Sequence, residues 1–92
     1  METELNAHEK IIDWLMQCVR GNYVKTDDAD TLTDDSDLYE DGYIESRDFQ
    51  DFINRMEQQF QLTISEDYFF DERFSTIAGI SEIIVEIRNN GR

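Results

Sequence analysis

One hydroxyl group in this chain stands where it could do chemistry. Ser46 follows the stretch Asp41-Gly42-Tyr43-Ile44-Glu45, where an acidic segment gives way to an amphipathic pattern. A serine at the start of a helix can cap that helix by accepting a backbone hydrogen bond. The same position exposes the hydroxyl to a modifying enzyme. Ser46 is therefore a candidate attachment point for a covalent group, and helix capping is a second role that does not exclude the first.

The acidic segment before Ser46 suggests calcium binding. Eight acidic residues and no basic residue lie in it: Asp27, Asp28, Asp30, Asp34, Asp35, Asp37, Glu40 and Asp41. An EF-hand loop starting at Asp37 would place Gly42 correctly, but Tyr39 would occupy a position that needs an oxygen ligand. Asp48 would stand where the longer, bidentate Glu is required. We therefore expect no specific metal site, while weak divalent binding stays open.

Catalysis by this chain alone is not expected. His8 is the single histidine, and neither a nucleophile elbow nor a glycine-rich phosphate loop is present. The acids lie on a loop without apolar walls that could raise a carboxyl pKa for acid catalysis. His8 and Cys18 both fall in an amphipathic helix, where a half-buried histidine and a packed structural thiol are expected. A single cysteine cannot form an intramolecular disulfide, which suits a reducing, cytoplasmic location.

Four helical segments are predicted to position Ser46. Apolar residues at helical spacing predict longer helices over 4–20, 46–60 and 76–89, and a short helix over 67–72. The buried stripe of the second helix is formed by Phe49, Phe52, Ile53, Met56 and Phe60. A long acidic loop, residues 22–45, follows the first helix, with Leu32, Leu38 and Ile44 as anchors. The fold class is therefore all-α, a small four-helix bundle in one domain, 1–92.

The charge of the chain limits its partners. Ninety-two residues carry a formal net charge of −14, so nucleic acid and anionic membranes are not expected to bind. Basic protein surfaces are the natural complement. No stretch reaches the length needed to cross a membrane, and the N-terminal residues do not form a secretion signal. We expect a monomer whose stability depends on ionic strength, because its acids repel one another.

The stretch around Ser46 resembles the prosthetic-group site of acyl carrier proteins and the related peptidyl and D-alanyl carrier proteins. Leu38, Gly42, Ile44 and Ser46 match that pattern, with Glu45 in place of its Asp and Arg47 in place of its Leu. The resemblance runs from about residue 34 to residue 87. It implies that a phosphopantetheinyl transferase moves 4'-phosphopantetheine from coenzyme A onto Ser46. The thiol of that arm would then carry an acyl group as a thioester.

The resemblance also implies partners. Besides the transferase, these are acyl-loading and acyl-processing enzymes with basic docking surfaces. Asp41 and Glu45 would help to orient the modifying enzyme, and Arg47, Asp48 and Asp51 would form part of the docking face. General fatty-acid carriers present apolar side chains where this chain has Arg47, Gln50 and Asn54. We therefore expect a specialised carrier in a fatty-acid, lipid, polyketide or peptide pathway, rather than the housekeeping carrier.

Aromatic residues are concentrated in the segment after the second predicted helix. In the resembled family the short third helix borders the cleft that shelters acyl chains. The aromatic residues of this segment either narrow that cleft or pack as ordinary core: Tyr68, Phe69, Phe70 and Phe74. The alternative to a carrier is an unmodified acidic interaction module, with a weak calcium-binding protein as a third possibility.

Overall fold

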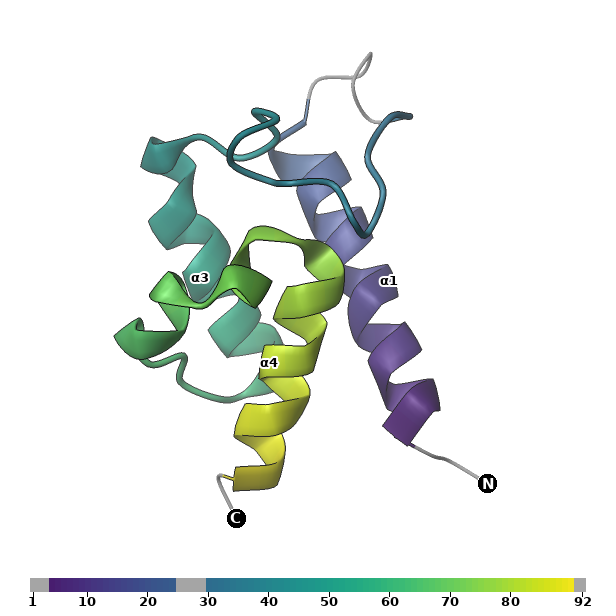
Figure 1. The fold of residues 1–92 in the computed structure, drawn as a ribbon, viewed down its shortest axis with the longest axis vertical. Coiled ribbons are helices and arrows are strands. Elements are labelled where there is room, and N and C mark those ends of the chain that lie inside the picture. The colour runs from purple at the N-terminus through teal and green to yellow at the C-terminus, as the bar shows by residue number, and fades with distance from the viewer. Residues whose placement is uncertain (1–3, 25–29, 91–92) are drawn as a thin grey trace.

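The fold is built from three α-helices that share one core. The computed structural model describes residues 4–24 and 30–90, with side chains from His8 onward, so Asp27 and Asp28 lie outside the described residues. The α-helices are α1 (Glu4–Asn22), α3 (Ser46–Phe60) and α4 (Ile77–Asn90). No strand is found in the described ranges. Figure 1 shows α1 and α3 on either side of α4, with the loop after α1 crossing one end of the bundle.

The three predicted long helices are present, with small shifts at their ends. The second helix has the predicted bounds, whereas the first extends to Asn22 and the last begins and ends one residue later than expected. No helix in the described part of the chain is both long and apolar enough to cross a membrane.

The predicted short α-helix over 67–72 is replaced by two 3₁₀ segments, η1 (Glu66–Phe70) and η2 (Glu72–Ser75). Two local caps explain the interruption. The Ser65 hydroxyl accepts a hydrogen bond from the N–H of Asp67, and the Asp71 carboxylate accepts one from the N–H of Arg73. Asp71 is itself extended (φ −77°, ψ 134°), so the helical path stops there and restarts. Asp and Ser favour such local bonds over a continuous helix.

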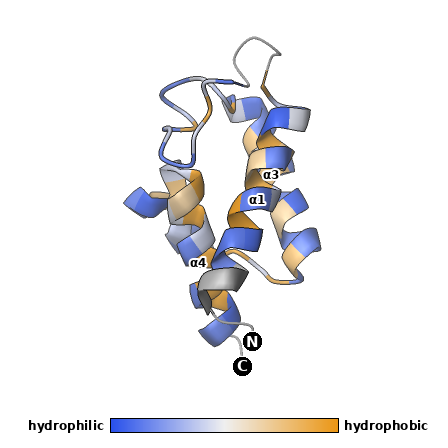
Figure 2. Ribbon diagram, turned by 90° about the vertical axis from the view of Figure 1, so that its right-hand side faces the viewer, coloured by the Kyte–Doolittle hydropathy of each residue, from blue (hydrophilic) through white to orange (hydrophobic). Residues whose placement is uncertain are grey.

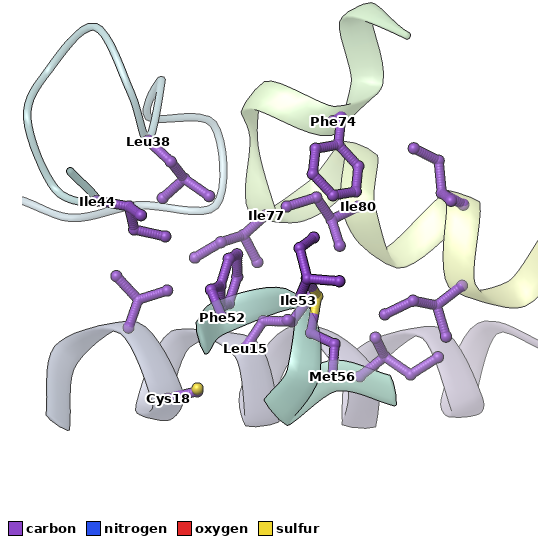
Figure 3. Packing of buried hydrophobic residues seen from close by; sticks show 14 of the residues in the cluster. Leu15, Cys18, Leu38, Ile44, Phe52, Ile53, Met56, Phe74, Ile77 and Ile80 are labelled. Atoms are coloured by element: carbon purple, nitrogen blue, oxygen red, sulfur yellow. The ribbon is translucent and has the colours of Figure 1, made fainter. Parts of the chain in front are cut away.

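The core is formed by apolar side chains from every helix and from the loop. Figure 3 shows Leu15, Phe52, Ile53 and Ile80 converging from α1, α3 and α4. Each of these four side chains is at most 3% exposed. Figure 2 shows hydrophobic and hydrophilic stretches alternating along the helices, as expected for helices that bury one face. Cys18 is buried, and burial is the main cause that raises the pKa of its thiol, which agrees with a structural role.

The described part of the acidic loop is fixed to the bundle. Leu32, Leu38 and Ile44 are each at most 2% exposed, as the sequence predicted for these anchors. The N–H of Leu38 donates to the carbonyl of Ser75 (2.8 Å), and the N–H of Ala78 donates to the carbonyl of Asp34 (2.9 Å). The loop therefore lies against the start of α4.

A close backbone contact joins η2 to α4. Gly79 is buried, and a Cβ atom placed on it would lie 2.0 Å from the carbonyl oxygen of Arg73. Arg73 also binds Asp71 (2.8 Å) and Glu86 (3.2 Å) through its guanidinium group. Only glycine lets the two backbones come this near. This contact fixes the position of η2, which carries Phe74.

Candidate functional site

Ser46 is the first residue of α3, and its side chain is exposed. The N-cap residue is Glu45, in an extended conformation (φ −86°, ψ 159°) and without a side-chain capping bond. The prediction that Ser46 is the N-cap was therefore wrong by one residue. No hydrogen bond from the Ser46 hydroxyl to another described residue is found. The hydroxyl is therefore accessible and is not used to close the helix.

The backbone before Ser46 explains this position. The N–H of Ile44 donates to the carbonyl of Leu38 (2.9 Å), and both side chains are buried. Between them Gly42 turns the chain with φ +83°, a conformation that residues with a Cβ atom rarely adopt. Because Ile44 is held in the core, the chain is still extended at Glu45, and the helix can begin only at Ser46.

An open apolar pocket of about 770 Å³ lies beside Ser46. The residues that line it come from the loop, from α3 and from the 3₁₀ segments: Tyr39, Gly42, Ile44, Glu45, Ser46, Phe49, Phe69 and Phe74. Four of these eight residues are aromatic. A flexible group attached to Ser46 would have apolar surface directly beside it.

These four aromatic residues form the aromatic wall of the pocket. Phe49 is at its centre, with ring centroids 5.7 Å from Tyr39, 5.2 Å from Phe69 and 5.8 Å from Phe74. The Tyr39 hydroxyl donates to the carbonyl of Phe74 (3.1 Å), so the loop is joined to η2 across the pocket. Burial, followed by the nearby Asp37 carboxylate, raises the pKa of Tyr39. The phenol therefore stays protonated and remains a hydrogen-bond donor at neutral pH.

The aromatic segment, predicted either to narrow a cleft or to pack as ordinary core, contributes to the pocket beside Ser46 and to the core, where Phe74 is 2% exposed. Phe69 and Phe74 line the pocket, whereas the Tyr68 hydroxyl donates to Glu86 of α4 (3.0 Å). Phe70 does neither, because its side chain is 89% exposed. Sequence reasoning did not find Tyr39 as a pocket residue. A tyrosine between Leu38 and Glu40, within an acidic segment, is predicted to be an ordinary loop residue. Only its contacts with Phe49 and Phe74 assign it to the wall.

Glu45 and Arg47 form an exposed ion pair next to Ser46. The distance from the Arg47 Nε to the Glu45 Oε1 is 3.0 Å, and the two side chains are 82% and 63% exposed. Such a pair contributes little to stability, so both groups can rearrange when a partner binds. Asp41 is exposed at the turn before Ser46, and Asp48 is half-buried in the first turn of α3. These four predicted residues therefore lie within five positions of Ser46 in the chain.

Asp51, the fifth predicted docking residue, is held by contacts within the chain. The Tyr23 hydroxyl donates to its Oδ2 (2.6 Å), and the Arg55 Nε donates to the same oxygen (2.9 Å). The bond from Tyr23, followed by that from Arg55, lowers the pKa of the Asp51 carboxyl. Asp51 thus joins α3 to the segment after α1, and its charge is partly neutralised before any partner arrives.

The start of α3 suits a phosphodiester. No backbone hydrogen bond from the N–H groups of Ser46 or Arg47 to the described residues is found, so both can donate to an anion. The positive end of the helix dipole and the exposed Arg47 guanidinium add to this attraction. Within the described ranges, no group of three histidine, cysteine or acidic side chains could hold a metal ion. The site therefore fits a phosphate linked to Ser46.

Comparison with known proteins identifies a family. A family model described as a phosphopantetheine attachment site matches residues 13–84, which is more than half of the chain and includes Ser46 and the pocket. Searches of curated proteins and of solved structures gave no match. The matched range begins within α1 and ends within α4, so it covers the site and the helices that position it.

Proposed function

Because this chain belongs to the phosphopantetheine-attachment family of acyl carrier proteins, whose domains bind 4'-phosphopantetheine covalently, we propose that the Ser46 hydroxyl is the attachment point. The observation that carries the proposal is an exposed hydroxyl without an intramolecular partner, at the start of a helix and at the rim of an apolar pocket. In the attachment, the Ser46 Oγ loses its proton and bonds to the phosphorus that carries the pantetheine part of coenzyme A. The pyrophosphate P–O bond breaks, 3',5'-adenosine bisphosphate leaves, and a phosphodiester remains on Ser46.

The chain would serve as a carrier for other enzymes rather than as a catalyst. The 4'-phosphopantetheine arm supplies a thiol that holds acyl groups as thioesters. The residues of this chain would bind the arm, exclude water from it and attract partner enzymes. The N–H groups of Ser46 and Arg47 would bind the phosphodiester, and the aromatic wall around Phe49 would keep water from the apolar part of the arm or its cargo. Asp41, Glu45 and Asp48 would attract basic partner surfaces, including that of the transferase.

The polar face of α3 favours a specialised pathway, whether of fatty acids, other lipids, polyketides or peptides. Arg47 is paired with Glu45, and the side chains of Gln50 and Asn54 are hydrogen-bonded to each other (3.1 Å). A partner with an apolar surface complementary to this face would have to remove these polar groups from water, which costs binding free energy. Arg47→Leu should therefore raise the rate of loading by general fatty-acid enzymes, measured as acyl transfer to the modified chain. An unchanged rate would count against a specialised carrier.

Intact mass tests the attachment point. The purified chain is incubated with coenzyme A and a broad-specificity phosphopantetheinyl transferase, and its mass is recorded. We expect a gain of one phosphopantetheine in the wild type and in Ser65→Ala, and no gain in Ser46→Ala. Ser65 is the matched control because it is another exposed serine near the start of a helical segment, as the N-cap of η1. No gain with several transferases would instead favour the unmodified interaction module, and a calcium titration followed by NMR tests the third possibility.

A further inference from the structure

Phe70 is the one large hydrophobic residue that is exposed among the described side chains, with 89% of its surface accessible. Its neighbour Phe69 lines the pocket beside Ser46, and the Phe69 ring contacts Phe49 of α3 (centroids 5.2 Å apart). An exposed phenylalanine therefore follows, in the chain, a residue that lines the pocket beside Ser46. Single exposed apolar residues are common on proteins, so its meaning depends on its surroundings.

The 3₁₀ geometry of η1 explains why Phe70 points outward. With three residues per turn, consecutive side chains leave the axis in three different directions. Tyr68 takes the direction toward α4, where its hydroxyl binds Glu86, and Phe69 takes the direction toward the pocket. Phe70 is left with the third direction, which faces solvent. The cap at Ser65 and the extended residue Asp71 fix this arrangement at both ends of η1.

The helix next to the site offers a partner polar and charged side chains on its exposed face. The charged groups on its exposed face are largely paired within the chain, as Arg47 is with Glu45 and Arg55 with Asp51. Its polar residues Gln50 and Asn54 bind each other. A partner that reaches Ser46 would gain more from burying an aromatic ring, since buried aromatic side chains dominate binding energy at protein interfaces. Phe70 is the ring available for this.

The charges around Phe70 indicate the chemistry of the partner. Glu66, Asp67 and Glu72 are all exposed on the same short segments, whereas Arg73 is bound to Asp71 and Glu86. A second copy of this chain would bring a further charge of −14 to the contact and would be repelled. An anionic membrane would be repelled for the same reason. A protein surface with an apolar pocket and a basic rim would be attracted.

We propose that η1 is a docking surface on which Phe70 anchors a protein partner that presents an apolar pocket rimmed by lysine or arginine. Binding there would place the partner beside Ser46 and would bury Phe70 next to Phe69. That the partner is an enzyme acting on the arm rests on the proposed function, whereas the anchoring role of Phe70 does not.

Photo-crosslinking followed by affinity measurement tests this proposal. The chain carrying p-benzoylphenylalanine at position 70 is produced in the cells that make it natively and is irradiated, with the same probe at Asn89, an exposed residue near the end of α4, as control. We expect a protein adduct at position 70 that is absent at position 89. The crosslinked protein is then purified, and its Kd is measured against the wild type, Phe70→Leu and Phe70→Ser.

The expected affinities follow from the anchor and from its charged surroundings. Phe70→Ser should weaken binding about tenfold or more, and Phe70→Leu should weaken it less, because leucine keeps part of the apolar contact. Affinity for the wild type should fall as NaCl is added, and less steeply in Glu66→Gln/Asp67→Asn. Because Phe70 is exposed, thermal unfolding of all variants should match that of the wild type.

Several results would overturn the proposal. These are the lack of a protein adduct specific to position 70, an adduct only with lipid or with a second copy of the chain, and an unchanged Kd for Phe70→Ser. Binding that does not depend on salt would contradict a partner pocket rimmed by lysine or arginine. Mass analysis of the same samples separates this docking proposal from the proposal that phosphopantetheine is attached to Ser46. A chain that fails to gain phosphopantetheine but still binds through Phe70 would refute attachment at Ser46 and leave the docking surface standing.

Discussion

Ser46 lies one residue further into its helix than its type suggests. Serine is a preferred N-cap residue, yet the extended backbone at Glu45 gives the cap position to a residue without a capping bond. The cause is the buried Ile44, whose N–H is bound to the carbonyl of Leu38. The core contact of Ile44 thus outweighs the preference of serine for the N-cap position. As a result, the Ser46 hydroxyl makes no capping hydrogen bond.

The stability of Ser46→Ala follows from this placement. Loss of a serine N-cap typically costs about 1 kcal/mol, whereas exposed substitutions elsewhere usually change stability by less than about 0.5 kcal/mol. We expect Ser46→Ala to change the free energy of unfolding by less than about 0.5 kcal/mol, as measured by urea denaturation. The variant proposed to prevent modification would then be as stable as the wild type. A loss near 1 kcal/mol would show that the hydroxyl caps the helix in solution.

The pKa of the Asp51 carboxyl should depend on its hydrogen bonds with Tyr23 and Arg55. Because the Tyr23 and Arg55 bonds lower its pKa in the folded state, these contacts stabilise the fold at pH values above the ordinary Asp pKa. Their contribution is lost as the pH falls through the lowered value. In Tyr23→Phe we expect the Asp51 midpoint, followed by carboxyl ¹³C NMR, to rise toward the ordinary value.

Tyr68→Phe is the matched control for this titration, because it also removes a tyrosine hydroxyl that binds a carboxylate, here that of Glu86. The Asp51 midpoint should not move in that variant. Wild-type stability should also decline more than that of Tyr23→Phe between neutral and acidic pH. A midpoint that is the same in all three proteins would mean that Tyr23 does not bind Asp51 in solution.

At the scale of elements, η1 and η2 decide the shape of the site. They place Phe69 and Phe74 against Phe49, and they turn Phe70 to solvent. A continuous α-helix over the same residues would distribute these rings differently, because successive side chains would be separated by about 100° rather than about 120°. The caps at Ser65 and Asp71 therefore have consequences for the pocket as well as for the backbone.

Gly79 is the position on which this arrangement depends. In Gly79→Ala the new Cβ would meet the Arg73 carbonyl at 2.0 Å, so η2 or α4 must move. Overpacking of this kind typically costs about 1–3 kcal/mol, and we expect a loss at the upper end of that range or beyond, measured by urea denaturation. Modification of Ser46 should also slow, because η2 carries the pocket residue Phe74.

Gly21→Ala is the matched control for Gly79→Ala. Gly21 lies near the end of α1, and a Cβ atom there would have no described atom within 4 Å. Since alanine is favoured over glycine in helices by up to about 1 kcal/mol, this variant should be as stable as the wild type or slightly more stable. Equal losses in the two variants would contradict a close contact between η2 and α4.

At the scale of the whole molecule, charge opposes compactness. A net charge of −14 on 92 residues gives a repulsion that only screening or partners can relieve. We expect the thermal midpoint to rise with NaCl, by about 4–8 °C for each 1 kcal/mol of repulsion that salt removes. The variant Asp30→Asn/Asp35→Asn, which removes two exposed charges, should show a smaller rise. A midpoint that is independent of salt would contradict this account.

The sequence determined the elements and the candidate hydroxyl. Periodic apolar residues such as Phe52, Ile53 and Met56 specify a helix with one buried face, because this pattern is local. The order of Leu38, Gly42, Ile44 and Ser46 was enough to state the family resemblance that the family model confirmed. These features could be found because each depends on spacing within a short stretch of chain.

Only the tertiary structure decided how the site is arranged. The first residue of α3, the aromatic wall with Tyr39, the close contact at Gly79 and the exposure of Phe70 all depend on residues far apart in the chain. Local patterns could not rank Phe69 against Phe70, because adjacent phenylalanines have the same propensities and differ only in what packs against them. The sequence up to Ser46 thus identified its hydroxyl as the candidate site. The packing of α3, η1 and α4 determined which residues lie around it.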